Sequence, residues 1–271
     1  LTDYKGDAWF LSTPKFGKTF FKELALYKDK FPNWQGWTFT TFDNPHIDPE
    51  EIEDARRTMD NLYFRCEFLA EDVDLTGRPF AYAFDPIKHV RECHYTDAEE
   101  LHISFDFNVD PITCISAQLQ GNNVNVIEEF VLRNSDIYEL CEHIYMKLPK
   151  LNRLIVTGDA TGRNRQAISR GGVTYYHAIK EILRISEHQF NVPSVNFSNL
   201  NSRELIGRAF HFNRCFINPN CTYLINDLTY CEVGNDGKLK KESTGKNANL
   251  SHLMDCLKYM LINNFYKELD F

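Results

Sequence analysis

Apolar and polar residues alternate in several short runs of the chain, which is the pattern of β-strands with one buried face. The clearest run extends from Leu101 to Phe107, where every second side chain is apolar. Two further strands are expected at residues 113–120 and 124–132, with Gly121-Asn122-Asn123 as the hairpin turn between them. A run over 154–158 is almost wholly apolar and predicts a short strand buried on both faces.

Apolar residues at helical spacing follow these strands. They predict helices at residues 135–148, 174–186, 202–212, 221–230 and 250–266, and a further short strand is expected at 194–197. Three antiparallel strands followed by alternating helices and strands are the element order of a ribonuclease H-like domain, which is a mixed α/β sheet flanked by helices. Periodicity alone would also fit several other α/β folds.

The first part of the chain has its own set of elements. Strands are expected at residues 7–12 and 36–42, a helix at 18–28, and a second helix from Asp48 to about Leu69 or Glu71. Pro and Gly residues interrupt the segment after Asp72 and predict a domain junction, so we expect one domain over residues 1–72 and another over 73–271. The chain starts without Met and enters a strand-like run at once, so it is expected to be cut from a longer protein.

Composition narrows the class of protein. The 271 residues are 43% hydrophobic, enough to fill a core, and no apolar run approaches the roughly 18 to 20 residues of a membrane span. The eight cysteines form no CxxC pair and lie mostly in apolar runs, as expected of buried thiols in a reducing cytosol. The net charge of −8 argues against a protein coated with basic surface, although it permits a local basic groove.

Gly17-Lys18-Thr19 superficially matches the end of a P-loop. The Gly required five positions before the Gly-Lys pair is Ser12 here, and Pro14 removes a backbone N–H from the phosphate cradle. We therefore predict that this chain alone neither binds nor hydrolyses ATP.

Three acidic residues stand where a buried element would favour an apolar one. Asp106 shares a strand face with His102 and Ser104, Asp159 ends the fourth strand, and Asp255 lies among apolar residues in the last helix. If the first and fourth strands are neighbours, as in a ribonuclease H-like sheet, the three carboxylates converge. Carboxylates from different elements are what two Mg²⁺ or Mn²⁺ ions need for phosphodiester hydrolysis, so all three are expected to be catalytic metal ligands.

Each acid also has a simpler interpretation. Asp159 could be a turn residue at a strand end, and Asp255 could be an exposed acid on a helix. Glu129 and Asp110 are further candidate metal ligands, although Asp110 could equally turn the chain before Pro111.

Basic residues accompany two of the acids. The loop after Asp159 contains Arg163, Arg165 and Arg170, and the polar stretch before the helix of Asp255 contains Lys240 and Lys241. Both stretches could hold phosphates or could be solvated loops. Neither carries a base-reading pattern, so DNA contacts are expected to be with the backbone and largely independent of sequence.

Several motifs in order resemble the large terminase subunit of tailed bacteriophages. The opening LTDYKGDAWFLSTPK looks like the coupling segment late in the terminase ATPase domain, and TFDNP and FRCEFLAE look like its next landmarks. Phe16 departs from the pattern, because the family usually has Gly there. Asp106, Asp159 and Asp255 fall on the family's three nuclease carboxylates, the last within a His-x-x-Asp-x-x-x-Tyr signature at 252–259.

Two more segments of the nuclease part carry the resemblance. They are Asn201-Ser202-Arg203, whose Arg203 joins the DNA-binding candidates, and Ile217-Asn218-Pro219-Asn220-Cys221. The resemblance implies a ribonuclease H-like nuclease with two Mg²⁺ or Mn²⁺ ions, preceded by the end of an ATPase domain without its Walker A and B parts.

The implied function is endonuclease cutting of concatemeric viral double-stranded DNA during genome packaging. Portal protein and the small terminase subunit are the implied protein partners, no membrane is involved, and the expected location is the cytoplasm of a bacterial host. Two rivals stay open: another ribonuclease H-like nuclease, such as a junction resolvase or transposase, and a non-catalytic domain that docks on DNA or portal.

Overall fold

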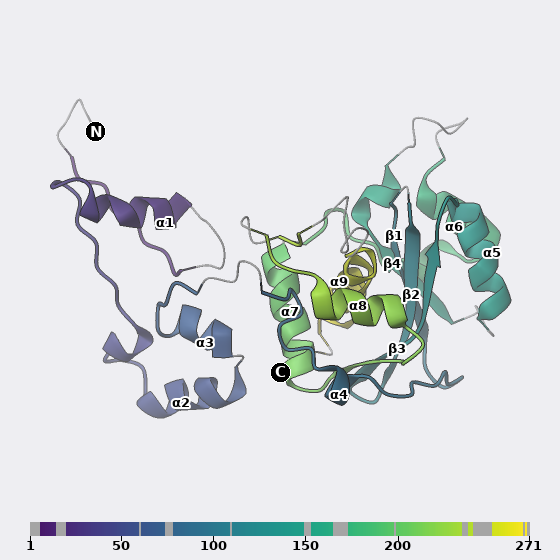
Figure 1. The fold of residues 1–271 in the computed structure, drawn as a ribbon, viewed down its shortest axis with the longest axis horizontal. Coiled ribbons are helices and arrows are strands. Elements are labelled where there is room, and N and C mark those ends of the chain that lie inside the picture. The colour runs from purple at the N-terminus through teal and green to yellow at the C-terminus, as the bar shows by residue number, and fades with distance from the viewer. Residues whose placement is uncertain are drawn as a thin grey trace. The chain divides into compact units, whose positions relative to one another are not determined.

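A computed structural model of the chain describes residues 6–14, 20–59, 61–73, 78–108, 110–148, 153–164, 173–197, 199–234, 238–240, 251–267 and 269. Internal contacts divide the chain into two compact units (Figure 1). The first unit is Leu1–Arg78 with Val233–Lys238, and the second unit is Pro79–Glu232 with Leu239–Phe271. The domain boundary expected between residues 72 and 73 stays a prediction.

Short helices make up the regular structure described in the first unit. They are α1 (Phe20–Ala25), η1 (Leu26–Asp29), η2 (Thr41–Asp43), α2 (Pro49–Thr58) and α3 (Asn61–Glu67). α2 begins as predicted, because the Asp48 side chain accepts a hydrogen bond from the backbone N–H of Glu50 at 2.9 Å. It ends at Thr58, earlier than expected, because Met59 has an extended backbone with φ −90° and ψ 156°.

The strands expected at 7–12 and 36–42 are wrong, since neither segment forms a strand among the described residues. The two segments meet through aromatic rings instead, since Trp9 stacks on Trp37 with centroids 5.8 Å apart. Just before the second segment, Trp34 stacks on Phe10 at 6.0 Å. Alternation of side chains predicts the two faces of a strand, whereas a strand also requires a neighbouring backbone with which to form hydrogen bonds.

A five-stranded mixed sheet forms the centre of the second unit (Figure 1). Its order is β4 (Leu154–Gly158), β1 (Leu101–Asp106), β2 (Ile112–Gln120), β3 (Asn123–Leu132) and β5 (Cys215–Ile217). β1, β2 and β3 are antiparallel to one another in turn, whereas β4 runs parallel to β1 and β5 runs parallel to β3. The predicted fold class, a mixed α/β sheet with flanking helices, is confirmed.

Helices cover both faces of this sheet (Figure 1). α5 (Ile137–Lys147) and α6 (Tyr175–Leu183) pack together on one face. α9 (His252–Phe265) crosses the other face, and α7 (Asn199–His211) and α8 (Thr222–Tyr230) pack against α9. The remaining short turns are α4 (Pro86–His89), η3 (Ala160–Arg163) and η4 (Glu187–Gln189).

Alternation along β1 separates the two helical layers. Ile103 and Phe105 are buried in the core that includes α5 and α6. His102 faces α9, where its ring packs edge-on against Phe265 at 4.6 Å. Asp106 lies on the same face as His102, at the end of β1 where α9 begins. The polar side of the predicted strand is therefore the side that α9 covers.

The edges of the sheet differ from the sequence prediction. Residues 194–197 form no strand, and Val195 and Phe197 are 74% and 54% exposed. The outer edge of β4 carries only an isolated bridge between Val156 and Phe190 in the described part of the chain. β5 occupies the opposite edge, and its three residues are too few to show an alternation.

The cysteines are all buried and form no disulfide, so the prediction of buried thiols is confirmed. Among the helices that the structure describes, none is long and apolar enough to cross a membrane.

Candidate functional site

Two of the three predicted acids stand at the ends of neighbouring strands. β1 and β4 are parallel and pair Phe105 with Gly158. The backbone N–H of Asp159 then donates to the carbonyl of Phe105 at 3.1 Å, which sets Asp159 beside the end of β1 that carries Asp106. Parallel strands end at the same edge of a sheet, so both carboxylates belong to one edge.

Gly158 allows this close approach of the two strands. Its φ of +150° is a backbone conformation that residues with a side chain rarely adopt. A Cβ at this position would lie 2.4 Å from the carbonyl oxygen of Phe105. A glycine directly before Asp159 is therefore required by the pairing that positions the carboxylate.

Asp106 is buried and linked to the beginning of α9. The residue is 4% exposed, and its Oδ2 accepts a hydrogen bond from the Asn108 amide and lies 3.3 Å from His252 Nδ1. The Asn108 amide nitrogen is also 2.7 Å from His252 Nδ1. Asn108 thus ties the end of β1 to the first residue of α9.

Asp159 is half-buried and held by one of its two carboxyl oxygens. Its Oδ1 accepts hydrogen bonds from the backbone N–H of Thr161 at 2.8 Å and from the Asn196 amide at 2.7 Å. Asn196 Oδ1 accepts in turn from the backbone N–H of Ala160 at 2.9 Å. Asp159 does start a turn, η3, as its simpler interpretation proposed, yet its Oδ2 has no hydrogen bond within the described residues.

Asp255 is a buried acid in the first turn of α9. It is 3% exposed, which excludes its interpretation as an exposed helix residue. The Lys258 ammonium, three residues further along the same helix face, donates to Asp255 Oδ1, and the two side chains are 8% and 4% exposed. A buried carboxylate needs such a partner, because removing an unpaired charge from water is costly.

The three carboxylates all affect the pKa of one side chain, the phenol of Tyr259. Burial raises the pKa of the Tyr259 hydroxyl, and Asp255, Asp159 and Asp106 raise it further, in that order. All three carboxylates thus act on one side chain of α9. Within the described ranges, no set of three or more His, Cys, Asp or Glu side chains is arranged to hold a metal ion.

The donor chemistry of this cluster nevertheless fits a hard divalent cation. Three carboxylates come from two strand ends and one helix, and Mg²⁺ prefers oxygen ligands of this kind. Oδ2 of Asp159 has no hydrogen-bond partner in the described part of the chain, so it is available for coordination.

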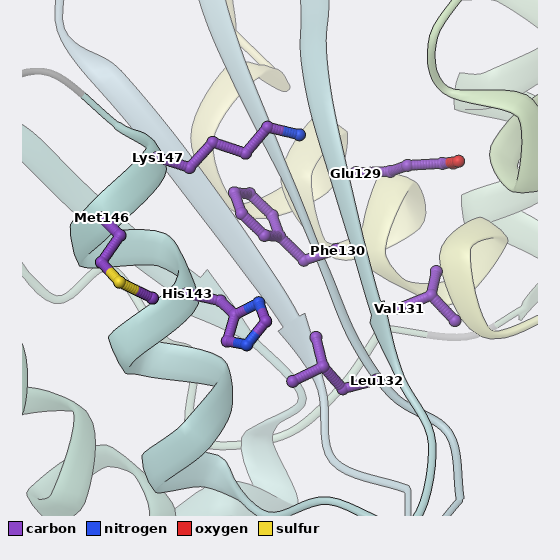
Figure 2. Close-up of a pocket in the computed structure, with 7 residues that line it drawn as sticks. All are labelled: Glu129, Phe130, Val131, Leu132, His143, Met146 and Lys147. Carbon is purple, nitrogen blue, oxygen red and sulfur yellow. The ribbon is translucent and has the colours of Figure 1, made fainter.

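The other two candidate ligands have structural partners. Glu129 accepts from the backbone N–H groups of Tyr223 and Leu224 at 2.9 and 2.8 Å and so caps α8. Figure 2 shows its side chain directed away from α5, opposite to the neighbouring Phe130. Burial raises the pKa of Glu129. Asp110 is exposed and accepts from the backbone N–H of Asn134 at 3.1 Å. Their role as ligands stays a prediction.

Sequence reasoning missed a buried acid that positions α9. Asp227 of α8 accepts from the backbone N–H groups of Leu253 and Met254 at 3.0 and 3.1 Å. Burial raises its pKa to about 6, despite the opposing effect of these hydrogen bonds. Asn108, Asn196 and Lys258 were also missed. Only Lys258 had a usable signal, since an acid and a base three residues apart share one helix face.

Two of the basic candidates are exposed in the structure, and three lie outside the described residues. Arg163 is exposed at the end of η3, where its Nη2 donates to the carbonyl of Val192 at 2.7 Å. Lys240 is exposed, with its Nζ 3.5 Å from Glu232 Oε2. Arg165, Arg170 and Lys241 lie outside the described residues.

The prediction that Arg203 contacts DNA is wrong. Arg203 is 1% exposed and donates to the carbonyls of Phe80 and Pro79 at 3.1 and 3.2 Å. Its guanidinium also lies over the ring of Tyr82, 4.8 Å from the centroid. A side chain enclosed in this way anchors α7 to the segment before α4 and cannot reach a phosphate.

A mixed sheet with acids at the ends of its first and fourth strands defines a chain of the ribonuclease H-like class. No family model matches the sequence. The chain is 28% identical over 269 residues to the terminase large subunit of Escherichia phage T5, a match that covers 93% of this chain and 57% of that protein. The chain thus spans little more than half the length of this curated relative.

Solved structures show the same likeness. The large terminase of a thermophilic bacteriophage, in complex with ATP-gamma-S, has a TM-score of 0.68 and 16% identity, covering 96% of this chain and 64% of that one. The P22 large terminase nuclease domain has a TM-score of 0.51 and 10% identity, covering 66% of this chain and 89% of that one. The chain is therefore similar in sequence to one bacteriophage terminase large subunit and similar in fold to solved large terminases.

Proposed function

We propose that the second unit is a divalent-metal-dependent endonuclease that cuts concatemeric viral double-stranded DNA during genome packaging. The observation that carries this proposal is that Asp106 and Asp159 lie at the ends of two neighbouring parallel strands, and that α9, the helix that contains Asp255, begins beside Asp106. The relation to terminase large subunits supports the choice of DNA as the substrate. On this proposal the nuclease domain is residues 73–271.

Asp106, Asp159 and Asp255 would hold two Mg²⁺ or Mn²⁺ ions. Such ions supply an activated water and neutralise charge at the leaving oxygen of the phosphodiester. The protein fixes the ligands in advance: Asn196 holds Oδ1 of Asp159, and Asn108 holds Oδ2 of Asp106. Lys258 provides a positive charge beside Asp255. Fixed ligands reduce the reorganisation needed when the substrate binds.

Basic side chains would hold the DNA backbone. Arg163 is the strongest of these candidates, because it ends the short turn that Asp159 begins. Arg165, Arg170, Lys240 and Lys241 are proposed as further phosphate contacts, each a point charge that carries no sequence information. Portal protein and the small terminase subunit are proposed partners, and the bacterial host cytoplasm is the proposed location.

The first unit is proposed to be the end of a terminase ATPase domain. Its support is an exposed set of large apolar side chains, which a domain of greater extent would cover. Trp9, Leu11, Trp37 and Phe39 are 72%, 88%, 60% and 72% exposed. On this proposal residues 1–72 belong to that domain and do not hydrolyse ATP alone.

A plasmid-relaxation assay with Mg²⁺, Mn²⁺ or EDTA tests the nuclease proposal. The 271-residue chain is expected to nick supercoiled DNA with either ion and not with EDTA. Asp106→Asn, Asp159→Asn and Asp255→Asn should each lower the rate at least about 100-fold, the usual effect of removing one electrostatic contact to a transition state. Glu142→Gln, an exposed acid on α5, is the matched control and should leave the rate unchanged.

The same assay separates the rivals. If Asp106→Asn or Asp159→Asn cut DNA at the wild-type rate, the proposed site would be refuted. Strong preference for branched DNA would favour a junction resolvase, and an inactive chain that binds no Mn²⁺ in calorimetry would favour a non-catalytic docking domain. Glu129→Gln and Asp110→Asn decide whether those two acids contribute.

A further inference from the structure

A hollow of about 450 Å³ adjoins η3, the short turn that Asp159 begins. It is formed by α6, the end of η3 and the segment around η4, and we call it the α6 hollow. Its lining includes Arg163, Tyr176, His177, Lys180, Glu187 and Phe190. This volume falls within the roughly 300 to 1,000 Å³ of small-molecule sites, so the hollow has room for part of a nucleotide.

Tyr176 connects the α6 hollow to the backbone of Asp159. Its hydroxyl donates to the backbone carbonyl of Asp159 at 2.8 Å, while its ring lines the hollow. Phe190 meets that ring edge-on, with centroids 5.9 Å apart and planes at 83°. The hollow is therefore one aromatic side chain away from the proposed point of cleavage.

Positive charge exceeds negative charge in the lining of the α6 hollow. Lys180 Nζ is 2.7 Å from Glu187 Oε1. Lys180 lowers the pKa of the Glu187 carboxyl most strongly, and Arg163 and His177 lower it further. Three basic side chains thus surround the single acid Glu187. Arg163 and Lys180 alone carry two positive charges against its one negative charge. An anion with several oxygens would complement this excess.

We propose that the α6 hollow binds a phosphate group of the DNA strand whose neighbouring phosphodiester lies at the carboxylates. The inference rests on the proposed nuclease function and adds His177 and Lys180 to the DNA contacts. Phosphate oxygens accept hydrogen bonds from Arg and Lys, and these contacts set the register of the strand. The rings of Tyr176 and Phe190 provide apolar walls for the attached sugar or base.

Fluorescence anisotropy with a labelled 20-base-pair duplex, in EDTA so that no cleavage occurs, tests this proposal. Lys180→Gln should weaken binding by the full chain about three- to tenfold and reduce the slope of log affinity against log salt by about 1. Glu187→Gln should strengthen binding, because it removes the competing carboxylate and releases Lys180. Arg184→Gln, one cation fewer just after the same helix, is the control and should bind as wild type within about twofold.

The two variants are expected to change DNA affinity in opposite directions. A misfolded Glu187→Gln variant would not gain affinity, so a gain cannot be explained by loss of folding. Equal binding by Lys180→Gln and Arg184→Gln, or weaker binding by Glu187→Gln, would overturn the proposal. Failure of the nuclease proposal is seen separately: Asp106→Asn would then cut plasmid normally while the three anisotropy results are unaffected.

Discussion

Lys258→Met tests the energetic role of the buried ion pair on α9. The Lys258 and Asp255 side chains are only 8% and 4% exposed, so removing the ammonium takes the charge of Lys258 away from a carboxylate that water hardly reaches. Breaking a buried pair in this way costs about 3 to 5 kcal/mol. For a unit of this size each kcal/mol corresponds to about 2 to 4 °C in Tm, so the midpoint should fall by roughly 6 to 20 °C.

Thermal and urea unfolding followed by circular dichroism in EDTA measure this effect. The matched control is Lys88→Met, because Lys88 pairs with Asp85 at the same spacing but is 67% exposed, with Nζ 3.5 Å from the carboxylate. An exposed pair contributes only about 0 to 1 kcal/mol, so this control should barely change the midpoint.

A double variant shows whether the cost arises from the isolated charge. Asp255→Asn combined with Lys258→Met removes both charges, and it should recover most of the stability lost by Lys258→Met alone. If Lys258→Met and Lys88→Met lose the same small free energy, the reasoning about burial is refuted. If the double variant is as unstable as the single one, the loss comes from packing of the lysine stem instead.

Two further predictions concern the elements that position the site. Burial raises the folded-state pKa of Asp227 from 3.8 to about 6, so its stabilising contribution is present below pH 4 and is lost as the pH rises through 6. The loss amounts to about 3 kcal/mol, and urea unfolding at pH 4 and pH 7 should show it in the wild type but not in Asp227→Asn. Gly158→Ala should lower stability by at least about 3 kcal/mol, because it combines backbone strain with a clash. Gly121→Ala is its control, since Gly121 also has positive φ but open space around it, and a comparable loss in both would contradict the role of strand approach.

The sequence predicted best those strands that pack against different surroundings on their two faces. β1 alternates because Ile103 packs on the layer of α5 and α6, whereas His102 and Asp106 meet α9, so its register can be read from residue type. The runs at 7–12 and 36–42 are also rich in aromatic residues, but they form no strand pairing in the described chain. Hydrogen bonding between strands depends on two segments, so it cannot be predicted from the residues of one segment alone.

Side-chain roles were harder to predict than elements. Asp106 was noticeable because a carboxylate on a strand conflicts with burial, and Asp255 because apolar residues surround it. Arg203 was misassigned because an arginine has the same appearance in a sequence whether it lies in solvent or under an aromatic ring. Asn196 and Asn108 gave no signal at all, since an amide that orients a carboxylate differs from a turn residue only in what it touches.

The position of α9 on β1 also governs when the site can exist. The helix is joined to the strand at both of its ends, through His252 and Asp106 at one and Asn264 and His102 at the other. The chain between them forms the rest of the sheet, β2 to β5, and the helices α5 to α8, so these contacts close late in folding. A nascent chain on the ribosome in which residue 255 has not yet been synthesised has only two of the three carboxylates. On the proposed nuclease function, a nascent chain would therefore lack cutting activity until α9 has been made, without any inhibitor.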